Sequence, residues 1–140
     1  MFQMRTPQQI ANLHRWVNAL RSGTYKRTTR ILRKGRDPNA SYCCLGVACD
    51  TFKSELGLEW KESFSAFEYF CMDGISTLLP GSVQDLLGID RYGSLPVPVA
   101  IEDGLCKSLV DLNVCGKFTF DQIADVIESQ LIRESDVQFE

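Results

Sequence analysis

A chain of 140 residues has the usual length of one domain and can bury about two-thirds of its unfolded surface, so we expect one hydrophobic core. The composition, with 44% hydrophobic and 24% charged residues, excludes disordered and fibrous proteins. No apolar run approaches the ~20 residues that cross a bilayer, so we expect no membrane-spanning helix. The net charge of −3 conceals a split, because residues 1–36 hold nine of the fifteen Lys and Arg residues and no Asp or Glu.

The first predicted element is a helix over residues 6–22. Thr6, Pro7 and Gln9 stand at its N-cap, first and third positions, where a capping box satisfies the free N–H groups of a helix start. Gly23 can end the helix. Apolar residues recur between these ends at helical spacing, namely Ile10, Leu13, Val17 and Leu20.

The next segment, residues 24–36, is rich in β-branched and basic residues, which predicts a short extended segment. A loop is expected at residues 36–39. Residues 42–56 then have the pattern of a second helix that Gly57 ends. One apolar face of this helix is formed by Leu45, Ala48, Cys49 and Phe52.

The middle of the chain predicts a β-hairpin over residues 64–79, because aromatic residues alternate there and Asp73-Gly74 can form the turn. A short helix should follow from Pro80 to Leu87 and stop at Gly88. Residues 95–99 contain two prolines, which confine this extended segment to a sheet edge or a loop.

Two helices are expected near the C-terminus, a short one at residues 105–112 and a longer one that Thr119 and Gln122 cap. The fold class is therefore α+β, with a small antiparallel sheet or hairpin packed with about four to five short helices. We expect a single domain over residues 1–140. Its parts are a basic helix and extended segment at 1–36, a core at 40–132 and a frayed acidic tail at 133–140.

The six cysteines lie in apolar or helical patterns, so we interpret them as reduced and mostly buried thiols. A zinc site is disfavoured because no C-x-x-C pair occurs, and a cysteine nucleophile would have His14 as its only histidine base. We expect no cofactor. The opening residues lack a signal-peptide core, which favours the compartment where the chain is made.

The basic segment indicates a site for an anion, because guanidinium groups bind phosphates through paired hydrogen bonds and tyrosines can stack on a base. The residues expected to contact the ligand are Arg21, Tyr25, Lys26, Arg27, Arg30, Arg33 and Tyr42. The alternative is that these cations pair with the acidic remainder or lie on one solvated surface. Nucleic acid is disfavoured because the acidic remainder repels a long polyanion and the basic segment lacks interleaved aromatic residues.

Three patches of sequence resemble a widespread family of small proteins encoded by bacteriophages and prophages. The patches are Trp16-x-x-Ala19-Leu20-Arg21-Ser22-Gly23-x-Tyr25, Tyr42-Cys43-Cys44-Leu45-Gly46-Val47-x-Cys49-Asp50 and Leu112-Asn113-x-x-Gly116-x-x-Thr119-Phe120-x-x-Ile123-Ala124-Asp125-x-Ile127-Glu128. The resemblance implies an accessory protein in the cytoplasm of the bacterial host, such as a counter-defence factor that captures a nucleotide-type immune signal. Members usually have Asp after the Asn of the last patch, where this chain has Val114.

We therefore expect a protein that sequesters a phosphate-bearing small molecule without turnover, with Asn113 and Asp125 reading sugar or base edges. Standard hydrolase signatures such as a Walker loop or an H-E-x-x-H helix are absent. One open alternative is an interaction module that docks on a host protein or on itself, since opposite charge blocks favour a homo-oligomer. Another is a small metal-assisted hydrolase that uses carboxylates, of which Asp125 and Glu128 share one helix face.

Overall fold

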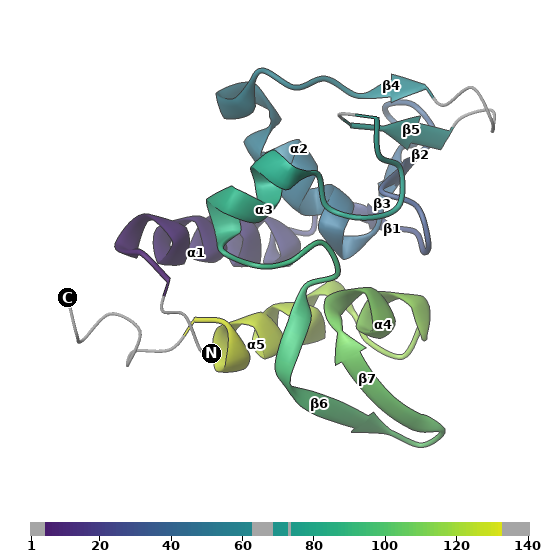
Figure 1. Ribbon diagram of the computed structural model, residues 1–140. Coiled ribbons are helices and arrows are strands. Elements are labelled where there is room, and N and C mark those ends of the chain that lie inside the picture. The colour runs from purple at the N-terminus through teal and green to yellow at the C-terminus, as the bar shows by residue number, and fades with distance from the viewer. Residues whose placement is uncertain (1–4, 63–68, 73, 133–140) are drawn as a thin grey trace.

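The structure is a computed structural model that describes residues 5–62, 69–72 and 74–132. Helices form the centre of the molecule, a small sheet lies at one end, and a two-stranded hairpin projects from the other (Figure 1). The expected α+β class is confirmed. The helices in the described ranges are α1 (Pro7–Arg21), α2 (Cys44–Leu56), α3 (Gly81–Leu87), α4 (Leu109–Val114) and α5 (Phe120–Gln130).

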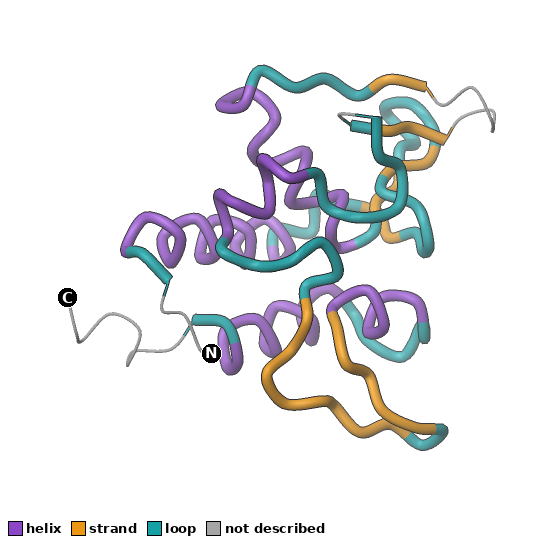
Figure 2. Tube along the Cα trace, viewed as in Figure 1, coloured by secondary structure: helices purple, strands orange, loops and turns teal. Residues whose placement is uncertain are grey.

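Seven short strands make the two sheets in these ranges, and Figure 2 shows them on opposite sides of the helices. The larger sheet has the order β1-β3-β2-β5-β4, with β1 parallel to β3 and the other pairs antiparallel. Its strands are β1 (Lys26–Arg27), β2 (Arg33–Lys34), β3 (Ser41–Tyr42), β4 (Lys61–Glu62) and β5 (Tyr69–Cys71). The hairpin consists of β6 (Ser94–Ile101) and β7 (Gly104–Ser108).

The core lies where α1 packs against α2, α3 and α5. Trp16 on α1 is fully buried and donates from its indole Nε1 to the main-chain oxygen of Cys44, 3.0 Å away. Asn12, which is also buried, donates to the main-chain oxygen of Leu86 and so ties α1 to the end of α3. The predicted capping boxes at Thr6 and Thr119 are both present.

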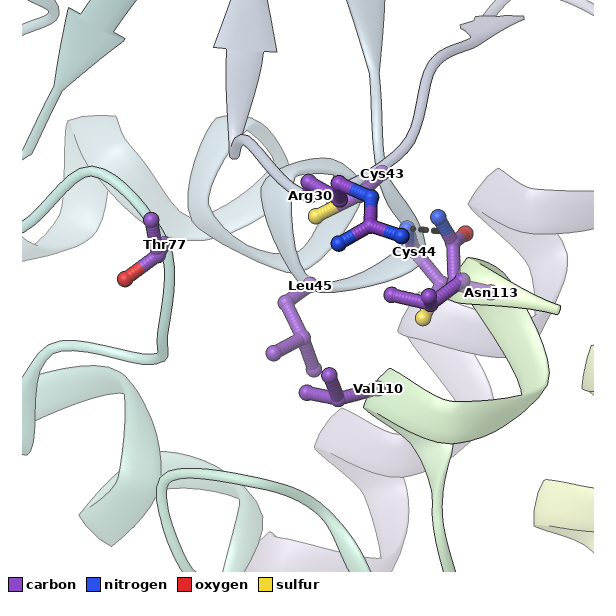
Figure 3. Close-up of a pocket in the computed structure, with 8 residues that line it drawn as sticks. Arg30, Cys43, Cys44, Leu45, Thr77, Val110 and Asn113 are labelled. Carbon is purple, nitrogen blue, oxygen red and sulfur yellow. Dashed lines mark hydrogen bonds between the residues drawn. The ribbon is translucent and has the colours of Figure 1, made fainter. Parts of the chain in front are cut away.

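The start of α2 depends on contacts from distant parts of the chain. Cys43 is the N-cap, and its sulfur accepts a hydrogen bond from the N–H of Gly46. The side-chain oxygen of Asn113 on α4 accepts from the N–H of Cys44 at 3.0 Å, as the dashed line in Figure 3 marks. The helix therefore begins two residues later than the expected Tyr42, which pairs in β3 instead.

Gly46 allows α2 to lie directly against the segment that carries Leu32. A Cβ atom at position 46 would stand 1.8 Å from the main-chain oxygen of Leu32, closer than any real contact. Leu32 is itself buried, and its oxygen accepts a hydrogen bond from the N–H of Cys43. The close approach of these two backbones positions β2 and β3 beside the helix.

Two predictions for the middle and end of the chain need correction. The segment 24–36 forms two separate two-residue strands, because residue 30 turns the chain with a positive φ. The helix expected at 105–112 is wrong, because residues 104–108 pair with β6 as β7 and the helix α4 starts at Leu109. Pairing with a strand already extended by prolines outweighs the local helical pattern.

The hairpin expected at 64–79 lies partly outside the described residues, which omit 63–68 and Asp73. Within the described part, β5 pairs with β2 and β4, and Met72 and Ile75 form an isolated antiparallel bridge. The residues after Ile75 do not continue as a strand. The short helix that Gly88 ends is confirmed as α3.

Strand β6 confirms the extended segment expected at 95–99. Its pairing with β7 is irregular between Ser94 and Val99. The main-chain N–H and oxygen of Val97 both bond to the side chain of Gln130 on α5, at 3.0 and 2.9 Å. The hairpin is thereby fixed to the helical centre through α5.

Two further sequence expectations concern the membrane and the thiols. None of the helices in the described ranges is long and apolar enough to cross a membrane. Five cysteines in these ranges are free thiols, and four of them are buried. These are Cys43, Cys44, Cys49 and Cys106, with Cys115 half-buried.

Candidate functional site

A cleft of about 280 Å³ opens between the larger sheet and α2, and we call it the Arg33 cleft. Strands β1, β2 and β3, the loop after β2, and the second half of α2 supply its walls. It brings together four of the residues that the sequence nominated for ligand contact, which are Tyr25, Lys26, Arg33 and Tyr42. Asp37, Asp50 and Lys53 also line the cleft.

Arg33 is the central cation of this cleft. Its guanidinium lies 5.7 Å from the centre of the Tyr42 ring, 5.8 Å from that of Trp60 and 4.7 Å from that of Phe70. These aromatic faces attract the cation and restrict its motion. Its Nε donates to the main-chain oxygen of Gly35, and no carboxylate pairs with it among the described residues. The outer guanidinium nitrogens therefore keep donors for a ligand.

Asp50 forms the floor of the cleft with three hydrogen-bond donors. The Tyr25 hydroxyl donates to it at 2.7 Å, Lys53 Nζ at 2.6 Å and the Trp60 indole at 2.9 Å. Burial raises the pKa of the Asp50 carboxyl, but the bonds from Lys53, Trp60 and Tyr25 outweigh it and leave the pKa below its ordinary value. Asp50 is thus an ionised carboxylate that three donors already engage.

Both tyrosines of the cleft keep their protons at neutral pH. Burial, together with the nearby Asp50 carboxylate, raises the pKa of Tyr42 to about 12. Burial and the hydrogen bond to Asp50 also raise the pKa of Tyr25 well above its ordinary value. The rings meet edge to face at 5.0 Å, which fixes the orientation of the Tyr42 ring in the wall.

Arg21 lies outside the cleft, on the α1–α5 side of the molecule. Its guanidinium bonds to Asp125 at 2.7 Å and also to Glu128, so the cation is already paired with two carboxylates. The two acids share one face of α5, as the sequence indicated, but they hold an arginine there. Arg21 and Asp125 are therefore partners of each other and not neighbours of the cleft.

Arg27 and Asn113 also contact each other. Arg27 Nη2 donates to the main-chain oxygen of Asn113 at 2.8 Å. The Asn113 amide donates in turn to the main-chain oxygen of Thr28 at 2.9 Å, while its oxygen caps Cys44. Asn113 is buried with both ends of its amide bonded, so it has no edge left for a sugar or a base.

Arg30 stands at a separate, smaller hollow. Figure 3 shows its side chain beside Cys43, Cys44 and Asn113, at the start of α2. The hollow has a volume of about 10 Å³, which is room for roughly one water molecule. The cations of residues 1–36 therefore do not converge as one set, and Lys26 and Arg33 are the two that the cleft retains.

Sequence reasoning missed Asp37 and Lys53 in the cleft. Asp37 lies in the loop expected at residues 36–39, directly after the basic segment, and this position next to the cations is the signal that could have linked it to the site. Lys53 stands in α2 three residues after Asp50, a spacing that places both on one helix face. That spacing could have linked Lys53 to the site.

The histidine and the cysteines that a nucleophilic mechanism would use differ in their exposure. His14 is exposed on α1, whereas the cysteines near α2 are buried, and burial raises the pKa of Cys43 to about 11. No group of three or more His, Cys, Asp or Glu residues with the spacing of a metal site occurs in the part of the chain that the structure describes.

Comparison with known families places this sequence in a wider group. A family model for a domain of unknown function, DUF8296, matches residues 8–131. The chain belongs to this family. No curated protein and no solved structure matches the chain. The DUF8296 match runs from α1 to the end of α5 and includes every residue of the Arg33 cleft named above.

The three sequence patches meet one another in this DUF8296 chain. Tyr25 of the first patch bonds to Asp50 of the second, and Arg21 of the first bonds to Asp125 of the third. Cys44 of the second patch accepts a hydrogen bond from Trp16 of the first and donates one to Asn113 of the third. The patches therefore encode internal contacts that hold α1, α2 and α5 together, and one of these contacts lies in the cleft.

Proposed function

We propose that this protein binds and sequesters a phosphate-bearing, nucleotide-like small molecule in the Arg33 cleft. The observation that carries the proposal is that Lys26 and Arg33, two cations with no carboxylate partner in the described part of the chain, lie with the ring of Tyr42 in one concave wall. Arginine and lysine donors suit phosphate oxygens, and an aromatic face suits a base. Small-molecule sites have volumes of ~300–1,000 Å³, and the cleft, at about 280 Å³, lies just below the lower end of this range, so it suits a small ligand of about one nucleotide unit.

Binding without turnover agrees with the electrostatics of the cleft. Asp50 is occupied by three donors, and Tyr25 and Tyr42 keep their protons, so none of the three serves as a base at neutral pH. A protein that captures a signal needs affinity alone. The likeness of the three patches to phage and prophage proteins supports a setting in the bacterial host cytoplasm, where sequestration of an immune signal would counter host defence.

Calorimetry with a panel of cyclic dinucleotides, ADP-ribose and mononucleotides tests the proposal. We expect at least one panel member to bind the wild type, and Lys26→Ala to weaken it by about ten-fold, the effect of losing one charge-assisted contact. Lys107→Ala is the matched control, because Lys107 is an exposed lysine on β7, outside the cleft. No heat with any panel member, or equal loss in both variants, would contradict the proposal.

Recovery of the ligand separates capture from hydrolysis. The complex is denatured by heat and the released molecule is analysed by chromatography. Intact ligand supports sequestration, whereas a product that forms in proportion to time and protein supports the hydrolase alternative. Addition of Mg²⁺ or Mn²⁺ in parallel samples includes a metal-assisted reaction in the same test.

A further inference from the structure

Asp37 places an unpaired carboxylate in a cleft whose central groups are cations. It is exposed, and its side chain has no hydrogen bond or ion pair among the described residues. Asp50, the other acid named in the cleft, already accepts hydrogen bonds from three donors. Asp37 therefore has more acceptor sites open to a ligand than Asp50 has.

The loop that carries Asp37 is held at the rim of the cleft. The N–H of Asn39 bonds to the oxygen of Arg36 at 2.8 Å, which closes a turn around Asp37 and Pro38, and Pro38 also lines the cleft. Arg33 itself anchors the start of this loop through its bond to Gly35. The charge of Asp37 acts within the cleft. Together with burial and the charge of Asp50, it raises the pKa of Tyr42.

A carboxylate beside a phosphate site weakens the binding of a bare anion, because like charges repel in a partly desolvated cleft. The same carboxylate strengthens the binding of a ligand that offers hydroxyl or amino donors, because bonds to a charged acceptor are the stronger kind. We propose that Asp37 selects ligands that combine a phosphate with such donors, as a nucleoside phosphate with a ribose diol does, over inorganic phosphates. This selection rests on the proposed function of the cleft.

The experiment compares ADP-ribose with inorganic pyrophosphate on the full chain by calorimetry. Both probes contain a diphosphate, and ADP-ribose adds hydroxyl and amino donors. For Asp37→Ala we expect ADP-ribose to bind about ten-fold more weakly and pyrophosphate to bind about three-fold more tightly. Asp37→Asn, which keeps one acceptor oxygen, should show the same gain for pyrophosphate and a smaller loss for ADP-ribose.

Asp85→Ala controls for the change in net charge, because Asp85 is an exposed acid on α3 outside the cleft, and it should leave both affinities unchanged. If Asp37→Ala shifts the affinities for both probes in the same direction, the selection is overturned, but the proposed function stays intact. Binding of neither probe by the wild type overturns the selection, and the proposed function falls with it only when every other member of the nucleotide panel also gives no heat. Thermal unfolding of each variant confirms that the fold is retained.

Discussion

The indole of Trp16 donates to the main-chain oxygen of Cys44, and this bond joins the middle of α1 to the first turn of α2. The N–H of the same Cys44 donates to Asn113 on α4. Cys44, at the start of α2, thus contacts both α1, which precedes it in the sequence, and α4, which follows it. Because α2 also supplies Asp50 and Lys53, these bonds set the position of the Arg33 cleft from outside it.

Replacement of Asn113 by alanine should strongly destabilise the fold. The change leaves the buried N–H of Cys44 and the partly buried oxygen of Thr28 without their partners, and the loss of a buried partner costs about 1–3 kcal/mol. Urea unfolding should therefore show a loss of about 2–5 kcal/mol. Asn18→Ala on the exposed face of α1 is the control and should change stability little. Equal midpoints for the two variants would contradict the capping role.

Gly46→Ala should disrupt the contact between α2 and the segment before β2. The added methyl group would meet the Leu32 oxygen at 1.8 Å, and because this oxygen belongs to the backbone and cannot swing aside, the helix must move. Overpacking of this kind costs about 1–3 kcal/mol or more. Gly81→Ala in α3 is a matched helical control, because nothing lies within 4 Å of its Cβ position. Thermal unfolding should separate the variants clearly, and a stable Gly46→Ala protein would refute the close approach.

Asp50 should make the protein sensitive to acid. Its folded pKa lies below the ordinary value of 3.8, so its ionised form stabilises the fold above that pH. This contribution is lost as the pH falls below 3.8 and through the lowered pKa. Urea unfolding at a series of pH values should show that Asp50→Asn is less stable at pH 7 and loses less stability below 3.8. Parallel curves for variant and wild type would show that the carboxylate has no such role.

Arg21→Ala should have small effects on both stability and ligand binding. The ion pairs with Asp125 and Glu128 are partly exposed, and such pairs contribute about 0–1 kcal/mol. Arg21 does not line the cleft, so calorimetry with any panel member that binds should give the wild-type affinity. A ten-fold loss of affinity in Arg21→Ala, with the fold retained, would place the ligand near α5 instead.

The predictions that succeeded rest on local signals. Thr6 and Gln9 mark the start of α1, and Thr119 and Gln122 mark the start of α5, because a capping box lies within four residues. Gly88 ends α3 for the same local reason. The error at residues 105–112 came from β7, whose strand state depends on pairing with β6 and not on its own pattern.

The candidate site was predictable in part. Tyr25, Lys26, Arg33 and Tyr42 share the cleft because β3 lies between β1 and β2, with Tyr42 opposite both Arg27 and Arg33. A run of cations cannot show which members meet acids from the far end of the chain, and Arg21 meets two of them. The register of strands and the position of α5 decide that outcome, and both are non-local.

The edge of strand β6 is blocked around Val97 against pairing with a further strand. Pro96 and Pro98 have no N–H to offer, and Gln130 occupies both backbone groups of Val97 between them. A foreign β-strand finds no ladder of donors and acceptors along this stretch, so intermolecular sheet growth is blocked there. The projecting hairpin can consequently expose Val97 and Leu105 to solvent without seeding aggregation along its proline-bearing side.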